Sequence, residues 1–200
     1  MDCNALNEVE IANQFKLHFE PEIFYSNVEL ITDSKYYTLI PELFADTQTC
    51  EALLKFHHPD FESNKYVIHS NGFPALKANL IIACPLKIEN AISSVFGKTN
   101  ISHNIIHFLN RIETNQGIYM SVHSTNIDIA VVSENGLLLL NTYSYSSNED
   151  ILYHLLNIIY TLKLQANMRQ LIIFNQQQNP ALQSLLIKHI PNTTIIQSTI

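Results

Sequence analysis

The stretch Gly117–Tyr143, GIYMSVHSTNIDIAVVSENGLLLLNTY, is the most informative part of this 200-residue chain. It contains three runs rich in aliphatic and β-branched residues, at Ile118–Ser124, Ile127–Ser133 and Gly136–Tyr143. The first two runs meet at Ser124-Thr125-Asn126, and the last two meet at Glu134-Asn135-Gly136, which is a strong tight-turn signal. The stretch therefore predicts three consecutive antiparallel strands.

The residues that follow predict two crossover units. Ser147 is a suitable N-cap, with Glu149 and Asp150 in the first turn of a helix that runs to about Leu164. The short apolar run Leu171–Phe174 is typical of a strand covered on both faces, Pro180 begins a second helix, and Thr194–Gln197 predicts a last strand. The resulting order, β-β-β-α-β-α-β with right-handed crossovers, is the layout of a ribonuclease-H-like core.

The first half of the chain predicts a smaller α+β lobe. The β-rich runs Val28–Thr32 and Tyr36–Ile40 flank Asp33-Ser34-Lys35 and together predict a hairpin. Pro41 is expected to open a helix that ends at His57-His58-Pro59. The remaining elements are two strands around an Asn71–Pro74 turn, Lys65–Ser70 and Ala78–Cys84, and two helices, Pro85–Phe96 and Ile101–Ile112.

These elements predict three segments along the chain. Residues 1–25 form an N-terminal arm or a short helix, residues 26–115 form the α+β lobe, and residues 116–200 form the ribonuclease-H-like lobe. The expected boundary, Glu113–Gln116, leaves no long linker, so the two lobes are expected to pack together. The fold class is therefore α/β, with a ribonuclease-H-like (actin-like) C-terminal lobe packed on a smaller, truncated N-terminal lobe.

The composition of the chain argues against some classes of binding partner and indicates a cellular compartment. The formal net charge is −7 and no stretch concentrates Lys or Arg, which argues against nucleic acid and against an anionic membrane surface. No apolar run is long enough to cross a bilayer, and Met1–Ala5 lacks the features of a signal peptide. Cys3, Cys50 and Cys84 are odd in number and widely spaced, as expected of reduced thiols. These features predict a cytoplasmic protein.

Two passages resemble a known family. Tyr37–Phe44 reads YTLIPELF, and Asn141–Tyr153 reads NTYSYSSNEDILY before a long apolar helix. The chain thereby resembles an uncharacterised bacterial family, found mainly in Bacteroidetes, with an actin-like ATPase (ASKHA) fold that PilM and FtsA share distantly. The resemblance spans Val28–Ile200. It also implies a remodelled first lobe, because an actin-like first lobe begins with a β-hairpin and Met1–Tyr25 supplies none.

The resemblance also implies where a nucleotide would bind. Actin-like proteins hold phosphates with Asp and Gly residues in hairpin turns, where glycine lets backbone N–H groups approach the oxygens. The equivalent turn here, His123–Asn126, has neither residue, and Asn175–Asn179 replaces a glycine-rich loop in a chain with four glycines. We therefore expect no cofactor, and ATP with Mg²⁺ is the alternative. The candidate nucleotide-binding residues are His123, Asp128 and Asp33.

Other chemistries have weaker support. A two-metal nuclease needs carboxylates on its first and fourth strands, and Ile118–Ser124 has none. His103 and His107 are expected to share a helix face, but no third ligand accompanies them, so they are interpreted as structural and no metal is predicted. No GxSxG motif or activated cysteine indicates a nucleophile, so no catalytic residue is predicted.

The leading hypothesis is therefore a non-catalytic interaction or scaffold protein that keeps an actin-like fold and binds a protein partner. The alternative is an atypical nucleotide-binding ATPase, with a metal-dependent nuclease third. Two further points stay open. Tyr143, Tyr145, Tyr153 and Tyr160 either form a partner surface or cover the sheet edge and helix seam. An exposed edge strand is compatible with a homodimer.

Overall fold

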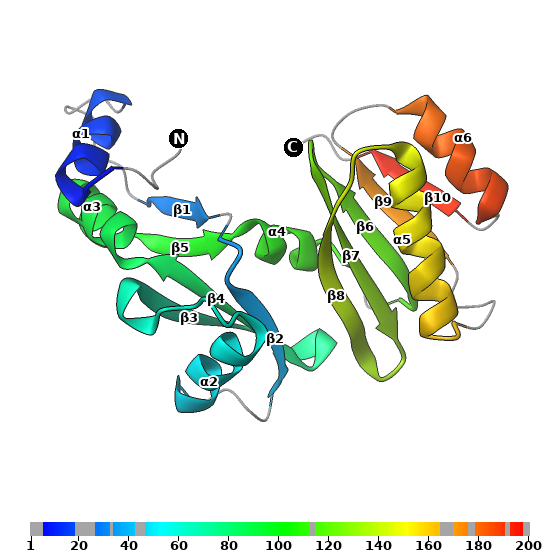
Figure 1. Cartoon of the computed structure of the whole chain (residues 1–200), viewed down its shortest axis with the longest axis horizontal. Coiled ribbons are helices and arrows are strands. Elements are labelled where there is room, and N and C mark those ends of the chain that lie inside the picture. Colours follow the sequence, from blue (N-terminus) through cyan, green and yellow to red (C-terminus); the bar gives the residue numbers. More distant parts are fainter. Residues whose placement is uncertain are drawn as a thin grey trace. The chain divides into compact units, whose positions relative to one another are not determined.

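The chain forms two compact units. Unit 1 comprises Met1–Pro74 and Ala78–His107, and unit 2 comprises Ala75–Lys77 and Phe108–Ile200. The structure, a computed structural model, describes residues 6–18, 27–32, 34–42, 47–112, 115–164, 170–175, 179–190 and 193–197 (Figure 1). Among these residues, no helix is long and apolar enough to span a bilayer.

Unit 2 contains a five-stranded sheet in the order β10-β9-β6-β7-β8. β6 (Gly117–Val122), β7 (Asn126–Ser133) and β8 (Gly136–Ser144) form an antiparallel meander. β9 (Leu171–Asn175) lies parallel to β6, and β10 (Thr193–Gln197) lies parallel to β9. The predicted order β-β-β-α-β-α-β is therefore confirmed.

Both helices of unit 2, α5 (Asn148–Thr161) and α6 (Pro180–His189), cover the same face of this sheet (Figure 1). Alternate residues of the strands meet the apolar faces of the helices in one core. As predicted, Ser147 caps α5: it accepts a hydrogen bond from the Asp150 N–H, and Asp150 closes a capping box. α5 ends at Thr161, earlier than predicted. The fully buried members of the core include Met120, Ile129, Ile151, Leu155 and Leu186.

The opposite face of the sheet has a separate aromatic layer. The Phe174 ring stacks with the Tyr119 ring, with a centroid separation of 6.2 Å, and meets Phe108 edge-on. The guanidinium of Arg111 lies 4.1 Å from the centroid of the Phe174 ring. Partial burial lowers the pKa of Arg111 from its usual value. Both faces of the central strands are thus covered, as the uninterrupted apolar run of β9 predicts.

Unit 1 is built around a three-stranded antiparallel sheet in the order β2-β4-β3. β4 (Ala78–Pro85) lies between β2 (Tyr37–Pro41) and β3 (Tyr66–Phe73), and α2 (Thr47–His57) packs on the sheet through Leu54. Two short 3₁₀ turns, Ser63–Lys65 and Pro74–Leu76, lie on either side of β3.

The rest of unit 1 contains two smaller assemblies. α1 (Glu8–His18) packs on α3 (Leu86–Phe96), so the first residues of the chain include a docked helix. β1 (Glu29–Thr32) pairs in parallel with β5 (Asn100–His103), which leads directly into α4 (Asn104–Asn110).

The predicted hairpin at Val28–Ile40 is wrong. The two strands exist, but β1 pairs with β5 and β2 pairs with β4. β4 is buried from Ala78 to Cys84 and pairs on both sides, so non-local pairing with β4 outweighs the local turn signal. Asp33, at the expected turn, lies outside the described residues.

Three further boundaries differ from the predictions. Pro41 is the last residue of β2, and an edge strand tolerates a proline because one side makes no ladder hydrogen bonds. Glu42 after it is in 3₁₀ conformation, and α2 begins at Thr47. Asn71–Phe73 belong to β3 and not to a turn. The helix predicted over Ile101–Ile112 begins only at Asn104, because Asn100–His103 pair with β1.

Candidate functional site

The turn after β6 contains the two candidate residues that the structure describes. β6 ends at Val122 and β7 begins at Asn126, and the His123 N–H donates a 2.9 Å hydrogen bond to the Asn126 carbonyl. Residues on β7 alternate between the faces of the sheet, so Asp128 lies on the face opposite the α5 and α6 core. In register, Asp128 stands between Ser121 of β6 and Thr142 of β8.

The Asp128 carboxylate is held from both sides. Its Oδ2 lies 2.7 Å from Nε2 of His123, and its Oδ1 accepts a 2.6 Å hydrogen bond from the Thr142 hydroxyl. The Asp128 side chain is 5% exposed, whereas the His123 side chain is 29% exposed. A nearly buried carboxylate therefore orients an imidazole that reaches solvent.

Tyr145, which directly follows β8, makes two further hydrogen bonds to the same turn. Its hydroxyl donates a 2.6 Å hydrogen bond to the His123 carbonyl, and its N–H donates to the Thr125 carbonyl at 3.1 Å. The turn is thus tied to β7 through Asp128 and to the chain after β8 through Tyr145. Chemically, the arrangement fixes a histidine rotamer and a turn conformation.

The structure brings the candidates His123 and Asp128 into direct contact. Asp33, the third candidate, lies outside the described residues. Thr142 and Tyr145 complete the cluster, although the sequence pattern predicts no role for Thr142 and marks Tyr145 only as one of four tyrosines of a partner surface or a packed seam. The signal for Thr142 is its cross-strand register with Asp128, which cannot be read without knowing the irregularity in β8.

The prediction that His103 and His107 share a helix face is wrong. His103 belongs to β5 and is buried, while His107 is on α4. Nε2 of His103 lies 2.9 Å from the Ser34 carbonyl, and Nδ1 accepts a 3.1 Å hydrogen bond from the Ile105 N–H. A carbonyl can only accept, so Nε2 bears the proton. His103 therefore links the start of α4 to Ser34, which lies between β1 and β2.

Ser102, His107 and Glu29 lie close together but do not form a hydrolase triad. The Ser102 hydroxyl is 3.3 Å from Nε2 of His107, and Oε1 of Glu29 is 3.9 Å from the same nitrogen. A catalytic triad places the nucleophile and the acid on opposite ring nitrogens. Across the described residues, no group of three or more His, Cys, Asp or Glu side chains is close enough together to hold a metal ion.

A second histidine–carboxylate pair lies in unit 1. Nε2 of His69 on β3 is 2.9 Å from Oε2 of Glu89 on α3, and both side chains are about one-quarter exposed. Burial, and to a lesser degree the Glu89 charge, raise the pKa of the nearby Cys84 thiol to about 12. Cys84 is therefore a protonated, buried thiol and not a nucleophile.

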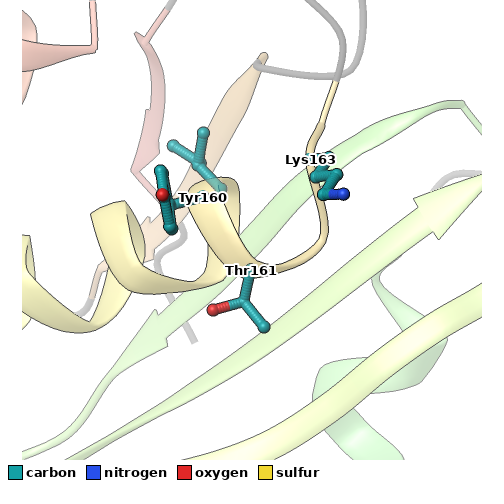
Figure 2. A pocket seen from close by; sticks show the side chains of 4 residues that line it. Tyr160, Thr161 and Lys163 are labelled. Carbon is teal, nitrogen blue, oxygen red and sulfur yellow. The ribbon is translucent and has the colours of Figure 1, made fainter.

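A surface hollow of about 510 Å³ lies beside the C-terminal end of α5. Its lining comes from one short segment, Ile159, Tyr160, Thr161 and Lys163, which Figure 2 shows on the last turn of the helix and just beyond it. Small-molecule sites usually have polar groups that converge from several elements. This hollow lacks such convergence among the described residues, so it is better described as part of a surface.

Comparison with known proteins identifies the family. The model of the family described as "Protein of unknown function (DUF3822)" matches residues 2–193. The chain belongs to this family. A search of curated proteins found no match.

Comparison with solved structures supports the fold. A Bacteroides thetaiotaomicron protein with an actin-like ATPase fold and unknown function matches with a TM-score of 0.71 at 20% identity, covering 93% of this chain and 76% of that one. A PilM–PilN type IV pilus biogenesis complex matches with a TM-score of 0.48 at 9% identity, covering 94% of this chain and 75% of that one. The match to the Bacteroides thetaiotaomicron protein confirms the actin-like fold expected from the sequence.

Proposed function

We propose that this DUF3822 protein is a non-catalytic binding protein in which the actin-like fold supports contacts with a protein partner. The observation that carries the proposal is the engagement of both Asp128 oxygens, at 2.7 Å by His123 and at 2.6 Å by Thr142. A carboxylate that coordinates Mg²⁺ must present an oxygen to the ion or to its water shell. Asp128 would have to give up one of these hydrogen bonds to do so.

The backbone of the same turn supports the proposal. A phosphate cradle directs successive backbone N–H groups at the ligand. Here the His123 N–H is used by Asn126, and the His123 carbonyl is used by Tyr145. His123 also adds a side chain where a glycine would allow close approach. The turn is therefore better suited to holding the sheet together than to holding a nucleotide.

The proposed partner class and compartment follow from charge and cysteine chemistry. A net charge of −7 disfavours nucleic acid and anionic membranes, so we propose a protein as the partner. Cys50 and Cys84 are buried thiols, which is typical of a reducing compartment. On these grounds the protein is proposed to act in the cytoplasm.

The alternative is an atypical nucleotide site at the same turn. The observation that favours it is the 2.7 Å contact between His123 and Asp128, which places an oriented imidazole at the turn where an actin-like protein contacts phosphate. In this reading His123 would contact a phosphate, while Asp128 would keep the imidazole oriented. The two functions make opposite predictions about ligand-induced stabilisation.

Thermal unfolding with and without millimolar ATP, ADP and Mg²⁺ separates the two. A ligand at 100 times its Kd stabilises the native state by about 2.7 kcal/mol, which is several degrees for a chain of this size. We expect no shift in the wild-type protein and no phosphate release. An Mg²⁺-dependent shift that Asp128→Asn removes, together with phosphate release, would establish the alternative. Thr125→Val, an exposed change in the same turn, is the matched control.

A further inference from the structure

The outward face of α5 carries three large apolar side chains in solvent, beside the exposed polar residues Asn157 and Thr161. Tyr153, Leu156 and Tyr160 are 65%, 39% and 84% exposed. They are spaced three and four residues apart, so they form one stripe along the helix. The inward face of α5 is formed by other residues, namely Ile151, Leu155 and Ile158. α5 thus has large apolar side chains on two sides, and only one of these sides packs on the sheet.

Opposite charges flank the two ends of this stripe. Glu149 is exposed in the first turn of α5, and Lys163 is exposed just after the helix ends. Along the chain the order is acid, tyrosine, leucine, tyrosine, base, at positions 149, 153, 156, 160 and 163. Glu149 and Lys163 each lie seven residues from Leu156, and Tyr153 and Tyr160 lie three and four residues from it. Reversing the order therefore reproduces the spacing to within one residue, with the sign of the end charge exchanged.

We propose that the outward face of α5 is a homodimer interface in which two copies of α5 pack antiparallel about a two-fold axis near Leu156. This inference rests on the proposed binding function and names the partner as a second copy of the chain. Antiparallel packing places Tyr153 of each copy against Tyr160 of the other, and Leu156 against Leu156. Glu149 of each copy then faces Lys163 of the other, so an isologous contact is complementary in both shape and charge.

The hollow at the end of α5 fits this arrangement. It is an open part of the surface lined by Ile159, Tyr160, Thr161 and Lys163 (Figure 2). In the antiparallel pair this hollow lies where Tyr153 of the second copy arrives, with Glu149 one helical turn further on. The lysine at its rim thus lies within reach of an incoming carboxylate.

The size of the stripe sets the expected affinity. A fully buried aromatic side chain covers roughly 150–250 Å², so two exposed tyrosines and one leucine offer about 300–400 Å² per copy. With flanking contacts the total stays below about 1,200 Å², which is the range of weak or transient interfaces. We therefore expect a weak, reversible dimer.

Sedimentation equilibrium of the full chain from about 1 to 500 µM tests the proposal. The wild-type protein should dimerise, and Tyr160→Ala should weaken the dimer at least about tenfold. Phe56→Ala, which removes an aromatic ring that is 80% exposed on α2 in unit 1, is the matched control and should leave the Kd unchanged. Far-UV circular dichroism of each variant checks that α5 is retained.

Charge reversal tests the antiparallel arrangement. Glu149→Lys and Lys163→Glu should each abolish self-association, because each places like charges together at both ends of the stripe. An equimolar mixture of the two variants should dimerise again, as should the double variant Glu149→Lys/Lys163→Glu. Each single change also opposes the dipole of α5, so recovery in the mixture distinguishes an interface effect from a folding effect.

A wild-type protein that remains monomeric to 500 µM would overturn the inference. A dimer that is insensitive to Tyr160→Ala would overturn it as well and would point to another surface, such as the edge strand β8. Neither result affects the proposed function unless nucleotide also stabilises the protein and is hydrolysed. A monomer without nucleotide binding would mean that the partner is a different protein.

Discussion

Removing the Thr142 hydroxyl tests whether the hydrogen bonds of Asp128 to His123 and Thr142 stabilise unit 2. We call these contacts the Asp128 brace. Thr142→Val keeps the shape of the side chain and deletes the donor that lies 2.6 Å from Oδ1 of Asp128. Asp128 is nearly buried, and a hydrogen bond to a charged group contributes about 1.5–3 kcal/mol to stability. We therefore expect Thr142→Val to lower the free energy of unfolding by about 2 kcal/mol.

The double-mutant cycle with Asp128→Ala isolates the interaction between these two side chains. Asp128→Ala removes the acceptor of both Thr142 and His123, at an expected cost of about 3 kcal/mol. In that background Thr142→Val should cost about 0.5 kcal/mol or less, because this hydrogen bond no longer exists. The expected coupling energy is about 1.5 kcal/mol.

Urea unfolding provides the free energies, and hydrogen exchange of peptides from β6, β7 and β8 assigns the loss to unit 2. Thr125→Val, in the exposed part of the turn, is the matched control and should stay within about 0.5 kcal/mol of wild type. A Thr142→Val cost that is equal in both backgrounds would refute the brace. The 2.6 Å contact would then contribute nothing to stability.

Three further predictions concern backbone, thiol and acid behaviour. Gly97→Ala should lower the free energy of unfolding by about 1–2 kcal/mol because of the positive φ at this position. Gly136→Ala should lower it further, because the new Cβ would also lie 2.8 Å from the Leu76 carbonyl oxygen. Equal losses for the two variants in urea unfolding would contradict this. Cys84, with its thiol pKa raised to about 12, should resist alkylation at pH 8 until the protein unfolds, as peptide mass spectrometry can show. Backbone N–H groups of Ser146 and Ser147 lower the pKa of Asp150 below its unfolded value of 3.8. Asp150 therefore stabilises the folded protein above that pH, and this stabilisation is lost as the pH falls through the lower, folded pKa. Acid unfolding of Asp150→Asn should lack this pH-dependent loss of stability.

Unit 2 could be predicted from the sequence because its signals are local. The meander follows from runs of apolar residues joined by short turns, and Glu134-Asn135 marks the tightest of them. The start of α5 follows from Ser147 and Asp150, which are three residues apart and form the capping box. Each of these features depends on residues that are close together in the chain.

Unit 1 was predicted less well because its sheet pairs are distant in sequence. Glu29 of β1 pairs with Asn100 of β5, and Tyr37 of β2 pairs with Ile82 of β4. The turn signal between β1 and β2 does not show whether each strand is better buried beside the other or beside a strand that is distant in sequence. Pro41 shows the same limit: its fixed φ suits either a helix start or the end of an edge strand, and only the sheet order decides.

The candidate site combines both situations. His123 and Asp128 could be selected because a hairpin turn places them together by local geometry. Thr142 could not, because counting residues outward from the Ser133–Gly136 pair places Asn141 opposite Asp128. An irregularity between Val131 and Val132 shifts the register by one residue and brings Thr142 there instead. A shift of one residue exchanges the two faces of a strand, so the donor that completes the brace is fixed by a bulge that the sequence pattern does not mark.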